Sequence, residues 1–128
     1  MENRELEIMK SPILITGCAR SGTSLVAGCI NICGAFGGKM FGPSPYNRKG
    51  MFENQRIREE IDKGYLRSIG VDPKGQRPLP DIKNLTIPVN FRQQVTEVIL
   101  SEGYKSGPWF YKGARSCLFW PVWAVFIF

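Results

Sequence analysis

The strongest constraint on the fold is a short apolar run that is followed by a glycine-bracketed loop and an amphipathic segment. Ile13–Thr16 is rich in β-forming residues and predicts a buried strand. Gly17–Gly22 interrupts the chain, and apolar residues then recur at helical spacing from Thr23 to Cys33, before Gly34 ends the helix. A strand, a tight loop and a helix in this order are typical of α/β proteins.

The loop has the composition of an anion-binding turn. Its two glycines, Gly17 and Gly22, let the backbone turn tightly and approach an anion closely. Backbone amides of the loop and the positive end of the helix dipole then favour negative charge. Arg20 adds a full charge on a planar fork that suits phosphate or sulfate oxygens, and Thr23 and Ser24 offer hydroxyls. We therefore predict an anion site, with a plain strand-to-helix connection as the alternative.

The position of the cation in this loop argues against magnesium-dependent ATP hydrolysis. The common nucleotide-triphosphatase loop has a lysine after its second glycine, but Thr23 stands there in this chain and the cation comes earlier, at Arg20. No metal is expected, because the sequence has no histidine and its four cysteines match no zinc signature. Cys29 and Cys33, four positions apart on the predicted helix, are expected to be buried as small hydrophobic residues.

The rest of the chain predicts two more helices and one more strand. Glu53–Ile69 and Asn90–Ser101 have apolar stripes at helical spacing, and Trp109–Lys112 forms a short β-rich run between glycines. Loops rich in glycine and proline fill Ala35–Lys49 and Val71–Pro88. The order strand, helix, helix, helix, strand predicts a parallel pair joined by a long crossover.

Three segments in this order resemble the PAPS-dependent sulfotransferase superfamily, whose sulfate donor is 3′-phosphoadenosine-5′-phosphosulfate. Members carry a Pro-Arg/Lys-Ser-Gly-Thr-Thr/Ser loop, which is similar to Ala19–Ser24 with alanine replacing the proline. Many have an Asn-x-x-Gly-aromatic-aromatic-Glu segment, similar to Asn47–Asn54, in which Met51 replaces one aromatic residue. Many also have Trp-x-x-Lys-Asp-Pro-Arg before an apolar helix, similar to Trp109–Arg115 with Gly-Ala in place of Asp-Pro.

This resemblance implies a three-layer α/β fold of the P-loop class with a parallel sheet. Residues 1–128 would form one partial domain, apparently truncated, because the family continues into a strand and helix that grip the donor's 3′-phosphate. The implied chemistry is transfer of a sulfuryl group from PAPS to the hydroxyl of a small-molecule or carbohydrate acceptor, without a metal. The donor's 5′-phosphosulfate would be held by the loop residues Gly17, Cys18, Ala19, Arg20, Ser21, Gly22, Thr23 and Ser24.

Arg20 of the loop, Lys112 and Glu53 are the candidate catalytic residues, Glu53 as the general base because the chain has no histidine. Lys112 and Arg115 are candidates for contacting the transferring group or the acceptor, mainly because of the resemblance. For Lys112 and Arg115 the alternative is a pair of cations at the edge of the sheet, with their heads in solvent. For Glu53 the alternative is a charge that complements a helix dipole. Two other functions stay open for the chain: a truncated, inactive relative that binds anions weakly, and a P-loop phosphotransferase.

Charge and hydropathy limit the remaining possibilities. The net charge is +6, but the basic residues are scattered, so we read them as a solvated surface and expect no nucleic-acid partner. Met1–Lys10 has no apolar signal region, and Cys117–Phe128 is too short to span a membrane, so a cytoplasmic, reduced protein is expected. The uncharged stretch Leu118–Phe128 should be covered by other residues or should promote self-association.

Overall fold

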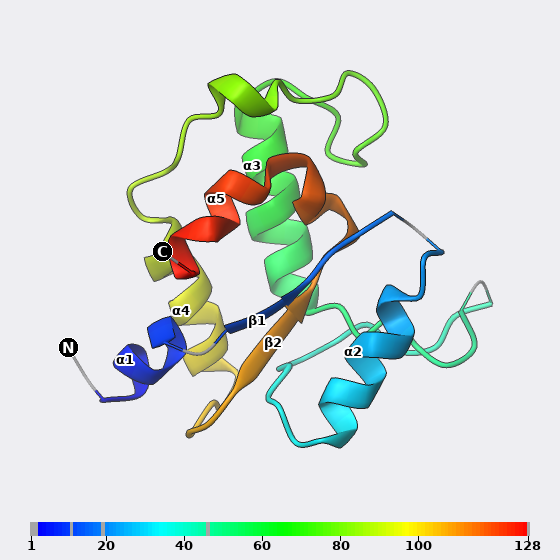
Figure 1. Ribbon diagram of the computed structural model, residues 1–128, viewed down its shortest axis with the longest axis vertical. Coiled ribbons are helices and arrows are strands. Elements are labelled where there is room, and N and C mark those ends of the chain that lie inside the picture. The colour runs from blue at the N-terminus through cyan, green and yellow to red at the C-terminus, as the bar shows by residue number, and fades with distance from the viewer. Residues whose placement is uncertain (1–2, 11, 19, 46, 128) are drawn as a thin grey trace.

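The structure is a computed structural model of the chain, and it describes residues 3–10, 12–18, 20–45 and 47–127 (Figure 1). Its helices and strands are α1 Asn3–Lys10, β1 Pro12–Ile15, α2 Thr23–Ile32, α3 Lys63–Ser68, α4 Phe91–Ser101, β2 Trp109–Lys112 and α5 Trp120–Trp123. A π-helical stretch, Ile57–Asp62, leads into α3, and 3₁₀ turns lie at Ile82–Asn84, Ala114–Phe119 and Ala124–Phe126.

The two strands β1 and β2 lie side by side and parallel, which confirms the predicted pair and its long crossover. Pro12 lies opposite Trp109, and Ile15 lies opposite Lys112. On the other side of β2, Phe36 forms a parallel bridge to Trp109, so the backbone there is also paired. The fold is mixed α/β, and within the described residues its sheet has these two strands.

Helices pack on both faces of this small sheet. Because side chains alternate along a strand, Trp109 and Tyr111 point to one face of β2 and Phe110 points to the other. The first face joins the main core, which includes residues of α1, α4 and the segment 57–69. Phe110 joins a smaller core with Ala27 of α2 and the partly buried Ile13 and Ile15 of β1. The carboxyl ends of both strands are therefore held between helices (Figure 1).

The helices of the crossover follow the predicted stripes. Ile57, Ile61 and Leu66 are buried where the sequence placed them, although the helix starts with π-type turns. Phe91 and Val95 of α4 are buried in the same core. The charged helix α1 was not predicted. It is fixed through Ile8, whose side chain is buried and whose carbonyl accepts a hydrogen bond of 2.7 Å from Trp109 Nε1.

The predicted burial of the α2 cysteines is wrong. Cys29 and Cys33 are exposed, and Leu25 and Ile32 on the same helix are 71% and 85% exposed. The buried residues of α2 are its smallest, Ala27 and Gly28. Small residues let a helix approach a sheet closely, so the side with larger apolar side chains faces away from the sheet.

The uncharged C-terminal stretch is largely covered by the chain itself. Phe119, Val122, Trp123 and Phe126 are all at most 4% exposed. Trp123 stacks on Tyr111 with ring centroids 4.9 Å apart, which fixes the stretch against β2. Of the large apolar side chains described in this stretch, Trp120 and Ile127 are the ones that remain exposed. Among the described residues, no helix combines the length and hydropathy needed to cross a membrane.

Candidate functional site

The loop between β1 and α2 adopts the tight geometry that its glycines predict. Gly22 caps α2 with φ +90°, and Arg20 also has a left-handed backbone, with φ +66°. A side chain on Gly17 would stand only 3.2 Å from Ser21 Oγ, so this glycine permits a close approach within the loop. Ser21 Oγ donates a hydrogen bond to the carbonyl of Cys18. Ala19, also predicted to bind the donor, lies outside the described residues.

The segment Asn47–Asn54 packs against α2. Asn47 Nδ2 donates a hydrogen bond of 3.3 Å to Ser24 Oγ in the first turn of that helix. The ring of Phe52 lies over Gly28, where an added Cβ would be 3.2 Å from the ring. Phe52 itself has φ +57°, a conformation that residues with side chains rarely adopt, and it immediately precedes Glu53. The backbone therefore turns sharply directly before Glu53.

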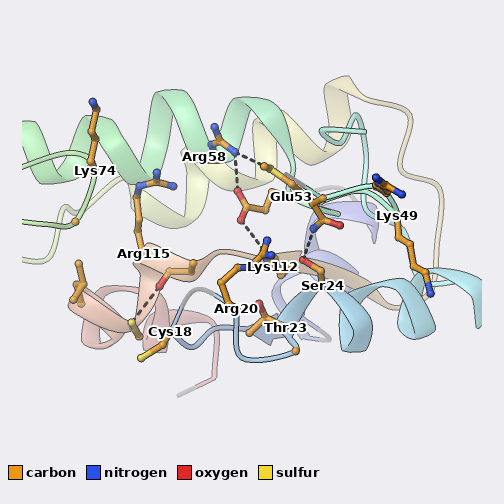
Figure 2. A pocket seen from close by; sticks show the side chains of 18 residues that line it. Cys18, Arg20, Thr23, Ser24, Lys49, Glu53, Arg58, Lys74, Lys112 and Arg115 are labelled. Carbon is orange, nitrogen blue, oxygen red and sulfur yellow. Dashed lines mark hydrogen bonds and ion pairs between the residues drawn. The ribbon is translucent and has the colours of Figure 1, made fainter. Parts of the chain in front are cut away.

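Glu53 is held between two cations in a nearly buried position. Its Oε1 accepts a hydrogen bond of 2.8 Å from Lys112 Nζ at the end of β2, and its Oε2 accepts one of 3.0 Å from Arg58 Nη1 (Figure 2). Glu53 and Lys112 are 5% and 6% exposed. The predicted alternatives, a solvent-facing lysine and a simple helix-dipole charge, do not match these contacts. Arg58 is also not the solvated surface residue that was predicted, because its guanidinium packs over the Phe41 ring at 4.1 Å.

One cleft of about 860 Å³ is lined by residues of the loop between β1 and α2, of the segment Asn47–Asn54 and of the end of β2. It is strongly cationic: seven described residues with positive side chains line it, against Glu53 as the carboxylate among them. The seven are Arg20, Arg48, Lys49, Arg58, Lys74, Lys112 and Arg115. Such a concentration of one charge in a concave site attracts anions and raises their local concentration.

A buried carboxylate fixes the backbone that carries Lys112 and Arg115. Asp62 accepts hydrogen bonds from Tyr111 Oη at 2.7 Å, Ser116 Oγ at 2.9 Å and Trp123 Nε1 at 2.9 Å. Burial raises the pKa of Asp62 to about 6, although the three donors each lower it. The pKa of Tyr111 is also raised, first by burial and then by the charge of Asp62.

Most of the site residues predicted from the sequence meet in this cleft. The described lining includes Cys18, Arg20, Gly22, Thr23 and Ser24 of the loop, and Glu53, Lys112 and Arg115 from elsewhere. Sequence reasoning missed Lys74, which lies in a proline-rich loop, and Asp62. The signal for Asp62 was an acid directly after Ile61 of the apolar stripe, a position that polar residues occupy when buried partners are present.

Comparisons with known proteins assign no family: no family model, no curated protein and no solved structure matches this chain. In the described part of the chain, no group of three or more acidic, cysteine or histidine side chains is placed to hold a metal ion.

Proposed function

We propose that this chain transfers a sulfuryl group from PAPS to an acceptor hydroxyl in the cationic cleft. One observation carries the proposal. Three segments far apart in the sequence, each similar to a sulfotransferase motif, converge on the same cleft through Ser24, Asn47, Glu53 and Lys112. Arg20 and the start of α2 lie at one side of this cleft, with Lys112 beside them (Figure 2).

The residues of the cleft suit the doubly anionic phosphosulfate group of the donor. PAPS supplies a sulfuryl group bonded to a phosphate, and both groups carry oxygens that accept charged hydrogen bonds. Arg20 and the hydroxyls of Thr23 and Ser24 would bind the phosphosulfate at the loop. Lys112 would stabilise the negative charge that grows on the phosphate oxygen as its bond to sulfur breaks.

The reaction needs no redox step. The acceptor oxygen forms a bond to sulfur, and the bond from sulfur to the phosphate oxygen breaks with its electron pair on that oxygen. The hydroxyl proton is released to solvent. Glu53 fits a positioning role better than proton abstraction, because each of its oxygens already accepts a hydrogen bond from Lys112 or Arg58. It would hold the Lys112 ammonium at the place where charge develops.

Calorimetric titration with adenosine 3′,5′-bisphosphate, the product of the donor, tests this proposal. We expect binding that Arg20→Ala weakens about 10- to 100-fold, the loss expected for hydrogen bonds to charged groups. Arg67→Ala is the matched control, because Arg67 is exposed on α3 and is not among the residues that line the cleft.

Two outcomes would overturn the proposal. Binding of ATP with magnesium, but not of the bisphosphate, would indicate phosphoryl transfer instead. Binding of neither nucleotide, in a chain that circular dichroism shows to be folded, would indicate an inactive relative.

A further inference from the structure

The cleft has a second cationic end, formed by Arg115 and Lys74. Figure 2 shows these two side chains at the opposite side of the cleft from Ser24 and Lys49, with Lys112 and Glu53 between the two sides. Cys18 of the loop also lies at this end, whereas Ser24 at the start of α2 lies at the other.

Arg115 contains a buried donor with no partner. Its Nε is shielded from solvent and makes no hydrogen bond to any part of the chain that the structure describes. Asp62 acts on Arg115 through its charge, but its carboxylate accepts hydrogen bonds from Tyr111, Ser116 and Trp123. An unsatisfied buried donor is costly. Other atoms of the Arg115 side chain line the cleft, so a ligand there can pair with the charge of the guanidinium rather than with Nε.

Lys74 is brought to this end by a well-defined turn. The carboxylate of Asp72 accepts hydrogen bonds from the backbone amides of Lys74, Gln76 and Arg77, with N–O distances of 2.9 to 3.3 Å. The turn packs against Arg115, because a Cβ added to Gly75 would lie 3.5 Å from Arg115 Cγ. Gly75 has φ +74°, so a glycine suits both the backbone and the close packing. The second cationic end is therefore built by contacts between two separate loops.

We propose that Arg115 and Lys74 bind an anionic group carried by the acceptor, which makes the acceptor a hydroxyl compound with a carboxylate, sulfate or phosphate. This inference rests on the proposed function, because it assigns Arg20 and the start of α2 to the donor. A neutral acceptor would offer no anion to the two positive charges at this end of the cleft. An anionic acceptor pairs with both, and its anchored end orients the hydroxyl toward Lys112.

Sulfate ions can probe the second end while the loop is filled. The chain is first saturated with adenosine 3′,5′-bisphosphate, and sodium sulfate is then titrated at constant ionic strength. We expect sulfate to bind this complex, and Lys74→Gln and Arg115→Gln each to weaken it about 10-fold. Lys83→Gln removes the same charge as Lys74→Gln, from an exposed residue that is not among those lining the cleft, and should have no effect. Lys74 is exposed, so its variant tests the site even if Arg115→Gln fails to fold.

A matched pair of phenols tests the acceptor class. In the bisphosphate complex we expect 4-hydroxybenzoate to bind at least about 10-fold more tightly than 4-hydroxybenzamide, and Lys74→Gln to remove the difference. Equal binding of the two phenols would overturn the inference, as would sulfate binding that neither variant changes. If Lys74→Gln weakens the bisphosphate itself as much as Arg20→Ala does, the anionic group belongs to the donor and the inference fails. Failure of the proposed function looks different, because then the bisphosphate does not bind even to the unmodified chain.

Discussion

Replacing Asp62 by asparagine should stabilise the protein at neutral pH. Asparagine has the shape of the protonated carboxyl and can form a hydrogen bond with each of the same three partners. Its carbonyl oxygen can accept from Trp123 Nε1, and its amide group can donate to the hydroxyls of Tyr111 and Ser116, which rotate to accept. Asp62→Ala, in contrast, leaves three buried donors without an acceptor and should cost at least about 3 kcal/mol of unfolding free energy.

The size of the gain follows from the pKa of Asp62. Burial raises it from 3.8 to about 6, a change of about 2 units. Each unit corresponds to 1.36 kcal/mol, so ionisation of Asp62 in the folded protein costs about 3 kcal/mol. Because the folded-state pKa is above the unfolded-state value, the folded protein binds more protons between these two values. The contribution of Asp62 to stability is therefore fully present below pH 3.8 and is lost as the pH rises through about 6.

Urea unfolding of the unmodified chain and of Asp62→Asn between pH 4 and pH 7.5 measures this effect. The two proteins should be similarly stable near pH 4, and the variant should become more stable by up to about 3 kcal/mol at pH 7.5. Taking the difference between the two curves removes other titrations, such as Glu59, whose pKa is lowered first by its hydrogen bond from Lys63. A difference that stays constant with pH, or a variant as unstable as Asp62→Ala, would refute the reasoning.

The remaining predictions concern the ion pairs and glycines around the cleft, and all are read from chemical unfolding. Glu53→Gln should cost about 3 to 5 kcal/mol, because Lys112 then stays buried without a carboxylate. Lys112→Met should cost less, since an arginine still neutralises the acid, and the reverse order would contradict this account. Gly22→Ala should lower the free energy of unfolding by about 1 to 3 kcal/mol, because Gly22 has a left-handed φ. As the matched control, Gly64→Ala should raise it by about 0.4 to 1 kcal/mol, because Gly64 lies in a helix with open space at its Cβ position. Gly28→Ala should cost about 1 to 3 kcal/mol, because an aromatic ring already lies 3.2 Å from its Cβ position; a cost below 0.5 kcal/mol would show that the ring moves freely.

Local patterns were sufficient to predict the elements that carry the site. The apolar run before Gly17 and the aromatic run at Trp109–Lys112 both became strands, and parallel pairing followed from the long helical crossover. The apolar side chains Ile57, Ile61 and Leu66, which recur at helical spacing after Glu53, are buried as expected. These features depend on spacing within a few residues, which the sequence displays directly.

Contacts between residues that are far apart in the sequence could not be predicted from it. Neither Glu53 nor Lys112 reveals its partner 59 positions away, so their pairing emerges only when the strand end meets the loop. The exposed apolar side of α2 was missed because burial was assigned to its larger side chains, whereas the buried positions are Ala27, which packs with Phe110, and Gly28, which lies under the Phe52 ring. Lys74 joins the cleft through a turn whose shape depends on Asp72 accepting backbone hydrogen bonds.

The parallel pairing of β1 and β2 has a consequence for how the protein forms during synthesis. Pro12 meets Trp109, its partner 97 positions later, so β2 must leave the ribosome before the sheet can close. Closing a loop of this length costs about 4 kcal/mol of chain entropy before any strand contact compensates for it. Folding should therefore be slow and late, and the nascent chain must keep its apolar β1 segment soluble until then. A chaperone that holds extended apolar segments would act on this protein mainly during that interval.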